Sequence, residues 1–140
     1  ERKQLVQGQA IVLADGRRIE PDDVLGEPAE GVKLVHVGDT GRTDNLVEVC
    51  RGADALVIEA TYAERDGDMA ERFGHLTAAR AARLALQAGV ANLLLVHISR
   101  RYSEREILRE AQQIFPNTIV PRDLERYRVT RGTVELVEPD

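Results

Sequence analysis

Two residues offer metal-binding side chains at points where buried strands should end. Asp39 follows the apolar run 34–37 after one glycine, and His97 directly follows the apolar run 93–96. The carboxyl ends of parallel strands are where α/β folds place their sites, and both side chains are good zinc ligands. Each also has an ordinary interpretation, Asp39 in a polar turn and His97 as a hydrogen-bonded histidine at a sheet edge. A catalytic zinc needs about three protein ligands, so the pair predicts part of a site.

Two further residues could handle a proton. His75 lies just before an alanine-rich stretch, where a helix N-terminus would disfavour its charged form, and it could protonate a leaving group or contact a phosphate. Glu59 follows the apolar run 55–58 and could orient a neighbouring imidazole. The ordinary alternatives are a histidine in a surface loop and a solvent-facing glutamate at a strand end.

Arginine and tyrosine follow His97 closely. Guanidinium groups match phosphate geometry, so Arg101 could bind a phosphate, and Tyr102 could stack on a base or bond a phosphate. The alternative is a solvated start of the next helix. Cys50 is expected to be a small buried helix residue, and as the single cysteine it predicts a reducing compartment such as the cytoplasm.

The elements that must position these residues alternate between strands and helices. Apolar runs and helical spacing predict strands at 32–37, 55–58, 92–96 and 118–120, and helices at 44–52, 77–89 and 104–115, with one or two helical turns within 63–73. Thr77 and Gly89 are expected to cap the middle helix, and Asp44 and Gly52 the first one. Short hairpins are predicted around Asp15-Gly16 and around Arg131-Gly132, the second with strands 127–129 and 133–137.

This order predicts an α/β fold with a mostly parallel sheet, helices on one face and a closing hairpin. The helices are too few to cover the second face. Residues 1–30 read as a β-hairpin and loop, and 31–140 as the alternating part. Because the first residue is Glu1 rather than methionine, we expect a piece of a larger protein. The net charge of −5 argues against general nucleic-acid binding through a basic surface, and no apolar run is long enough to predict a membrane span.

Taken together in order and spacing, these phrases closely resemble the C-terminal half of the ribonuclease Z family, which are tRNA 3′-processing endonucleases of the metallo-β-lactamase fold. The phrases are Gly38-Asp39-Thr40, Asn45-Leu46-Val47-Glu48, Glu59-Ala60-Thr61, Gly74-His75-Leu76-Thr77, and His97-Ile98-Ser99 with Arg101-Tyr102. The resemblance covers essentially the whole chain and implies half of an αββα sandwich.

The resemblance also implies a zinc-dependent endoribonuclease that removes 3′ trailers from precursor tRNA. It implies that Asp39 bridges two zinc ions and His97 binds one, and that His75 and Glu59 relay a proton to the leaving oxygen. Arg101, Tyr102 and Thr77 are implied to contact the substrate. The implied partners are the N-terminal half of the same fold and, in the full-length protein, a second copy. With two ligands from this chain, we expect weak or absent zinc binding by the piece alone.

Three departures from the family pattern keep alternatives open. The His-Xaa-His-Xaa-Asp-His signature and a further ligand histidine are absent, Ile58 stands where the family has histidine, and Leu76 stands where it has serine. The first places the missing chemistry on an N-terminal half. The other two leave open another phosphodiesterase or arylsulfatase-like hydrolase of the same fold. A non-catalytic α/β interaction module is the alternative of a different class.

Overall fold

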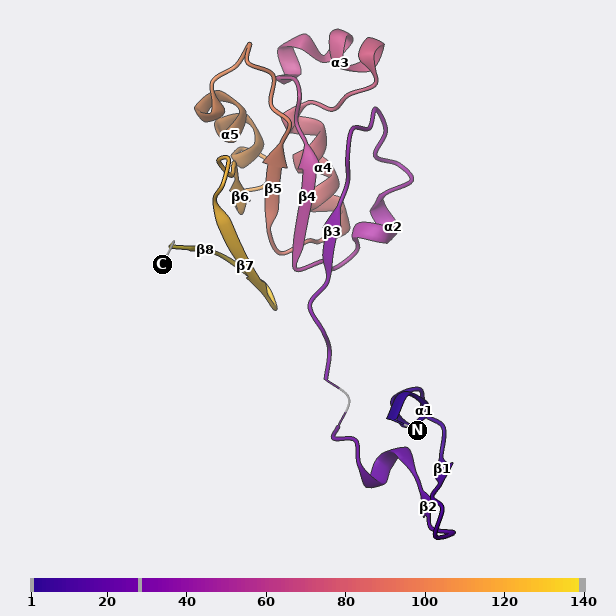
Figure 1. The fold of residues 1–140 in the computed structure, drawn as a ribbon. Helices are drawn as coiled ribbons and strands as arrows, with labels where there is room; N and C mark the ends of the chain where they lie inside the picture. Colours follow the sequence, from indigo (N-terminus) through magenta and orange to yellow (C-terminus); the bar gives the residue numbers. More distant parts are fainter. Residues whose placement is uncertain (1, 28, 139–140) are drawn as a thin grey trace. The chain divides into compact units, whose positions relative to one another are not determined.

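The computed structural model describes residues 2–27 and 29–138, which form two compact units, residues 1–30 and 31–140 (Figure 1). The first unit begins with helix α1 (Arg2–Val6), which the sequence did not predict, and continues with an antiparallel hairpin and a 3-10 turn η1 (Pro21–Asp23). The hairpin joins β1 (Ile11–Val12) to β2 (Arg18–Ile19), as predicted around Asp15-Gly16. Ile11 is buried, and most of its neighbours in this unit are exposed.

The second unit is built on a four-stranded parallel sheet in the order β3-β4-β5-β6. Its strands are β3 (Leu34–His36), β4 (Ala55–Glu59), β5 (Leu93–Val96) and β6 (Thr118–Ile119). They lie within the predicted runs, except that β4 runs one residue further, to Glu59. Continuous apolar runs are typical of parallel strands that are buried on both faces, and β4 and β5 are mostly buried.

Helices pack against one face of this sheet. The helical elements are α2 (Val47–Cys50), η2 (Glu64–Asp66), α3 (Gly67–Phe73), α4 (Ala78–Ala88) and α5 (Glu104–Gln112). Helix α4 contacts β4 and β5, and α5 contacts β6. Alanines on the buried side of α4 let it lie close over Leu56, Ile58, Leu93 and Leu95, all fully buried in one core with Cys50. The predicted α/β fold with helices on one face is confirmed.

The helix ends were predicted in part. Thr77 and Gly89 cap α4 as expected: the Thr77 hydroxyl accepts a hydrogen bond from the backbone N–H of Arg80 at 3.1 Å, and Gly89 adopts a left-handed φ of 63°. The prediction for α2 was wrong at both ends, because Leu46 and Arg51 flank the helix. Asp44 instead pairs with Arg42 at 2.8 Å, so its carboxylate is not used as a cap.

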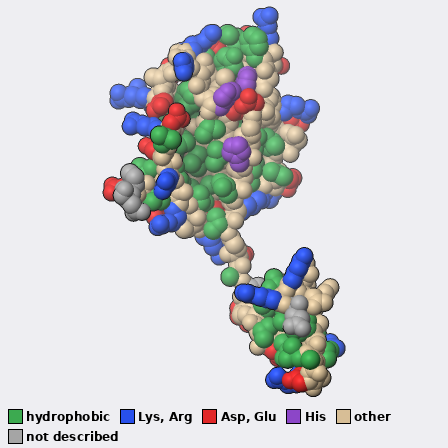
Figure 2. Space-filling model, in the orientation of Figure 1, with side chains coloured by type: hydrophobic (Ala, Val, Ile, Leu, Met, Phe, Trp, Pro, Cys, Tyr) green, Lys and Arg blue, Asp and Glu red, His purple; other side chains and the backbone are tan. Residues whose placement is uncertain are grey.

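The second face of the sheet carries apolar side chains that the helices do not cover. Residues at alternating positions point to this side, and they include Leu34, which is 55% exposed, and the half-buried Val57 and Val96. Figure 2 shows apolar side chains gathered on one face of this unit, beside histidine side chains.

The closing hairpin of β7 (Arg126–Thr130) and β8 (Thr133–Val137) is antiparallel, as predicted. No described helix is both long and apolar enough to cross a membrane.

Candidate metal centre

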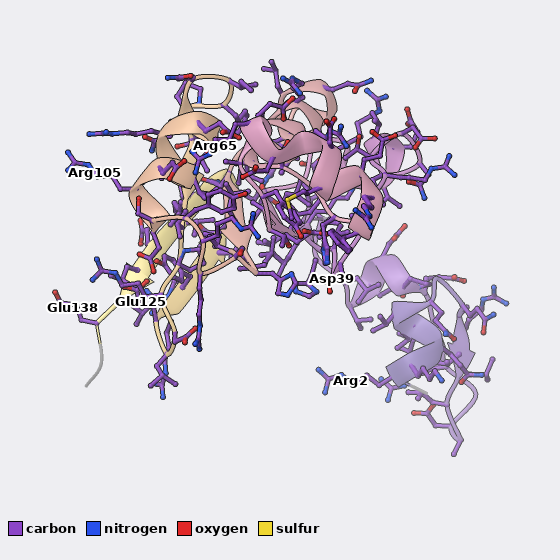
Figure 3. The ribbon with its side chains drawn as sticks, turned by 90° about the horizontal axis from the view of Figure 1, so that it is seen from above. Arg2, Asp39, Arg65, Arg105, Glu125 and Glu138 are labelled. Atoms are coloured by element: carbon purple, nitrogen blue, oxygen red, sulfur yellow. The ribbon has the colours of Figure 1, made fainter. Side chains whose placement is uncertain are left out.

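The predicted site residues meet at the carboxyl edge of the parallel sheet. Strands β3, β4 and β5 are neighbours in that order and run in the same direction, so the segments that follow them leave the sheet side by side. Asp39 follows β3, Glu59 is the last residue of β4, and His97 follows β5. Figure 3 looks down on the molecule from above, and Asp39 is labelled there. The sheet order therefore places Glu59 between the two candidate ligands.

Asp39, His75 and His97 form a group that could hold a metal ion. One ligand atom from each residue lies within 4.8 Å of the others. His97 Nδ1 is 3.1 Å from Asp39 Oδ1, and the rings of His75 and His97 are 5.5 Å apart between centroids. The Asp39 and His97 side chains are 60% and 52% exposed. One carboxylate and two imidazoles are a donor set that suits zinc. The structure thus brings His75, which the sequence predicted as a proton donor, next to the two residues that it predicted as ligands.

Glu59 is a buried carboxylate that supports this group. It is 1% exposed, and a charged group in that position needs hydrogen-bond partners. The backbone N–H of Thr40 donates to Oε1 at 2.8 Å, and the Thr61 hydroxyl donates to Oε2 at 2.5 Å. His75 Nδ1 lies 3.0 Å from Oε1. The predicted pairing of Glu59 with His75 is therefore present, and the solvent-facing alternative for Glu59 is wrong.

Thr61 is a further residue of the site, and no role was predicted for it from the sequence. Its hydroxyl lies 3.0 Å from His97 Nδ1 and 3.3 Å from His75 Nδ1, and its side chain is buried. One signal in the sequence could have found it. Thr61 lies two residues after Glu59, and in an extended segment residues two apart share a face. Extending β4 by two residues would have placed both side chains toward the histidines.

The backbone around His97 is held in an unusual conformation. His97 has a φ of 55°, in the left-handed region that non-glycine residues seldom adopt. The conformation costs about 1–2 kcal/mol, and such outliers gather at functional sites. The strand therefore ends abruptly at His97.

A close approach of two glycines brings the Asp39 loop to the His75 loop. A Cβ built on Gly41 would lie 2.9 Å from the Cα of Gly74, which is closer than real Cβ contacts. Gly74 ends α3 in a left-handed conformation, with a φ of 71°, and directly precedes His75. The absence of a side chain at Gly41 thus allows the two loops to touch, and the distance between Asp39 and His75 depends on this contact.

The structure corrects the predicted substrate role of Thr77. This residue is fully buried, and its hydroxyl both caps α4 and donates a hydrogen bond to Glu64 Oε2. The hydroxyl thus gives its one proton to Glu64 and accepts from Arg80, and the residue has no exposed surface with which to reach a substrate. We therefore assign Thr77 to the start of the helix.

Tyr102 and Arg101 lie in different environments. Tyr102 is buried, its hydroxyl donates to Asp66, and the guanidinium of Arg65 lies 5.1 Å from its ring centroid. Burial, together with the hydrogen bond to Asp66, raises the pKa of Tyr102 to about 12. The predicted stacking or phosphate contact of Tyr102 is therefore replaced by a packing role. Arg101 is exposed, with its Nη1 3.5 Å from Met69 Sδ, so its guanidinium remains accessible to a phosphate.

Comparison with known protein families shows which family the chain belongs to. Residues 6–98 match the model of the β-lactamase superfamily domain, which is well over half of the chain. The chain belongs to the β-lactamase superfamily. The metallo-β-lactamase fold protein YhfI from Bacillus subtilis superimposes with a TM-score of 0.60 at 22% identity, over 74% of this chain and 39% of that one. That likeness confirms the fold predicted from the sequence.

Curated members of the superfamily confirm the resemblance seen in the motifs. A ribonuclease Z from Bradyrhizobium sp. (strain ORS 278) is 53% identical over 128 residues, and the match covers 91% of this chain and 42% of the relative. A ribonuclease Z from Brevibacillus brevis is 44% identical over 134 residues, again covering 91% of this chain and 42% of the relative. The chain thus spans less than half the length of these superfamily relatives.

Proposed function

We propose that this chain forms part of the active site of a zinc-dependent endoribonuclease that removes 3′ trailers from precursor tRNA. The observation that carries the proposal is the group of Asp39, His75 and His97 at the sheet edge, backed by the buried Glu59. The identity to proteins named ribonuclease Z supports the substrate class. The accessible guanidinium of Arg101, four residues after His97, supports a phosphate contact.

Within this site we assign Asp39 and His97 as zinc ligands. Asp39 has two carboxylate oxygens and a side chain that is 60% exposed in the segment after β3, so it could bridge two ions. When bound, zinc supplies Lewis acidity, which lowers the pKa of water and stabilises negative charge on the transferring phosphoryl group. In this proposal the exposed Arg101 holds a substrate phosphate, and Glu59 and Thr61 orient the imidazoles.

We assign His75 as the proton donor to the departing 3′ oxygen. The contact of 3.0 Å between its Nδ1 and Glu59 Oε1 supports this role, because a carboxylate that accepts from Nδ1–H fixes the orientation of the ring and leaves Nε2 for the substrate. With Nδ1–H held by Glu59, the proton that leaves is the one on Nε2. The same contact also suits a zinc-ligating histidine, and metal analysis of His75→Gln separates the two roles. Retained zinc with lost cleavage supports the proton donor.

The remainder of the fold and its partners belong to the same proposal. The uncovered apolar face of the sheet supports packing of the N-terminal half of an αββα sandwich against it, since an exposed apolar sheet face is costly in water. That half would supply further ligands for two zinc ions, with weak zinc binding by this chain alone. A homodimer of the full-length protein and a cytoplasmic location complete the proposal.

The test uses the intact protein that contains these residues. It is incubated with a 3′-extended precursor tRNA and, separately, with a small chromogenic phosphodiester, before and after removal of metal by a chelator. We expect cleavage at the trailer, loss after chelation and recovery with zinc. Turnover of the small diester with intact precursor tRNA would contradict the ribonuclease assignment. Absence of bound zinc and of both activities would instead indicate a non-catalytic module.

A further inference from the structure

The hydroxyl group of Thr61 lies between both histidines of the site and the buried carboxylate. Oγ1 is 2.5 Å from Glu59 Oε2, 3.0 Å from His97 Nδ1 and 3.3 Å from His75 Nδ1. Thr61 is 9% exposed, so water does not compete freely for these contacts. Three polar neighbours therefore share one hydroxyl group.

A hydroxyl has one proton to donate, and the distances show where that proton lies. Two oxygens at 2.5 Å repel each other unless a proton lies between them, and 2.5–2.7 Å is about the usual length of a hydroxyl-to-carboxylate bond. The backbone N–H groups of Thr40 and Thr61 also donate to Glu59, as expected for an acceptor-only carboxylate. The Thr61 proton is thus committed to Glu59, and toward the histidines its oxygen can only accept.

The protonation of the two rings follows from this assignment. His97 Nδ1 faces the Thr61 oxygen at 3.0 Å and Asp39 Oδ1 at 3.1 Å, both acceptors, so Nδ1 must carry a proton. His75 Nδ1 faces the Thr61 oxygen and Glu59 Oε1, so it must carry one as well. In the neutral form of each ring the lone pair then resides on Nε2. Among the described residues, neither Nε2 atom has a hydrogen-bond partner.

We propose that Thr61 is a positioning residue that fixes the tautomers of His75 and His97, holding a proton on Nδ1 of each and leaving both Nε2 atoms free. This inference deepens the proposed function, because the lone pair of a free Nε2 can bind zinc, or can take up a proton that is then passed to the substrate. Because the hydroxyl proton goes to Glu59, the Thr61 oxygen acts as an acceptor toward both rings, with Glu59 as a second acceptor at His75.

The backbone makes Thr61 better suited to this role than Asp39, the other neighbour of His97 Nδ1. The Thr61 carbonyl accepts a hydrogen bond from the Ser99 N–H at 3.2 Å, which ties Thr61 to the loop that carries His97. A β-branched side chain also has few rotamers. Asp39 is 60% exposed, and a carboxylate that turns to a metal gives up its other contacts. Thr61 then remains as the partner that keeps the proton on His97 Nδ1.

The test reads the tautomers directly in the intact, metal-free protein. Long-range proton–nitrogen correlation spectra of the histidine rings are recorded for the wild type, Thr61→Val and Thr61→Ser, and the two rings are assigned by the peaks lost in His75→Gln and His97→Gln. Zinc affinity is measured by competition with a chromophoric chelator. The control is Thr118→Val, which removes another buried threonine hydroxyl, bonded to the Phe115 carbonyl outside the site.

We expect both wild-type rings to carry the proton on Nδ1. Thr61→Val should raise the share of His97 protonated on Nε2 and lower zinc affinity about 10- to 100-fold, as is typical when a supporting partner is removed. Thr61→Ser and Thr118→Val should match the wild type. A wild-type His97 protonated on Nε2, or unchanged zinc affinity in folded Thr61→Val, would overturn the proposal. Because neither readout uses RNA, failure to cleave precursor tRNA would refute the proposed function separately.

Discussion

The amino ends and the carboxyl ends of the parallel strands, here called the amino edge and the carboxyl edge of the sheet, both carry buried or half-buried polar networks. The two networks have different roles. At the amino edge, Asp54 accepts the backbone N–H of Lys33 at 2.7 Å and that of Gly132 at 2.8 Å. Asn92 donates to the carbonyls of Asp54 and Gly132. The polar side chains at this edge therefore satisfy backbone groups and anchor the tip of the closing hairpin.

At the carboxyl edge, the network includes side chains that remain accessible to a metal ion or a substrate. Glu59 and Thr61 hold one side of each imidazole, while Asp39 and His97 remain about half exposed. The carboxylate of Asp54 at the amino edge stabilises the fold. The buried carboxylate of Glu59 at the carboxyl edge accepts hydrogen bonds that orient the groups around the two histidines. The same types of residue thus serve stability at one edge and chemistry at the other, and four substitutions can test this contrast.

The largest effect is expected from Asp39→Asn. The variant keeps the shape of the side chain but removes its charge, so zinc affinity should fall more than the roughly 10- to 100-fold typical of a supporting residue. Bound zinc and cleavage of precursor tRNA by the intact protein measure the effect. Full zinc content with normal cleavage would show that the carboxyl edge does not depend on this carboxylate.

Glu59→Gln should come next. The amide presents an NH₂ group where the buried carboxylate only accepts, so it cannot receive the donors of Thr40, Thr61 and His75 together. We expect kcat to fall about 100-fold, within the range for general acid–base catalysis, with KM nearly unchanged. Zinc affinity should fall as well, because an amide NH₂ group cannot accept the Thr61 proton, which is then free to turn toward His97. Steady-state kinetics and metal analysis provide the check. An unchanged kcat would remove Glu59 and His75 from proton transfer.

Gly41→Ala should act at the same edge without altering a functional group. The added Cβ would meet Gly74 at 2.9 Å, so the Asp39 and His75 loops must separate by a few tenths of an ångström. We expect about a tenfold loss in kcat/KM, since small misplacements near reacting groups are costly. Gly38→Ala is the matched control in the same loop, because a Cβ there meets nothing within 4 Å. Equal activity of the two variants would contradict the loop contact.

Asp54→Asn should have the smallest effect and only on stability. Hydrogen bonds from the backbone N–H groups of Lys33 and Gly132 lower the pKa of Asp54. A lowered folded-state pKa means that the ionised carboxylate contributes stability above its unfolded pKa of about 3.9, and that this contribution is lost as the pH falls through the lower folded value.

The corresponding measurement compares Tm for the wild type and Asp54→Asn across pH. A small deficit of the variant at pH 7 should disappear in acid, while zinc content and cleavage stay normal at neutral pH. A loss of cleavage in folded Asp54→Asn would show that the amino edge also serves the chemistry, and the contrast between the edges would fail.

Local sequence patterns were enough to predict most of the elements of the second unit. The alanine-rich stretch between Thr77 and Gly89 forms a helix with both predicted caps, since cap chemistry is local. The strand runs and the closing hairpin were also predicted correctly. The error at Asp44 has a local cause: the nearby Arg42 offered its carboxylate an ion pair in place of the helix N-terminus.

Part of the site was predictable for a topological reason. Asp39 and His97 follow apolar runs, and parallel strands bring their carboxyl ends to one edge, so the two side chains could be expected to meet. The sequence could not show that Tyr102 and Thr77 are buried with their hydroxyl groups already bonded. Which side of a short polar segment faces inward depends on what packs against it.

The sequence by itself determined the residue types, the strand ends and the order of motifs that mark the superfamily, because these follow from neighbouring residues along the chain. The tertiary structure decided that β4 lies between β3 and β5, that Gly41 touches Gly74, and that Thr61 contacts both histidines. These contacts join residues that are distant in the sequence. The order of the strands and the packing of the loops bring their side chains to hydrogen-bonding distance. The two candidate ligands thereby came to lie beside His75, with the Thr61 hydroxyl in contact with both rings.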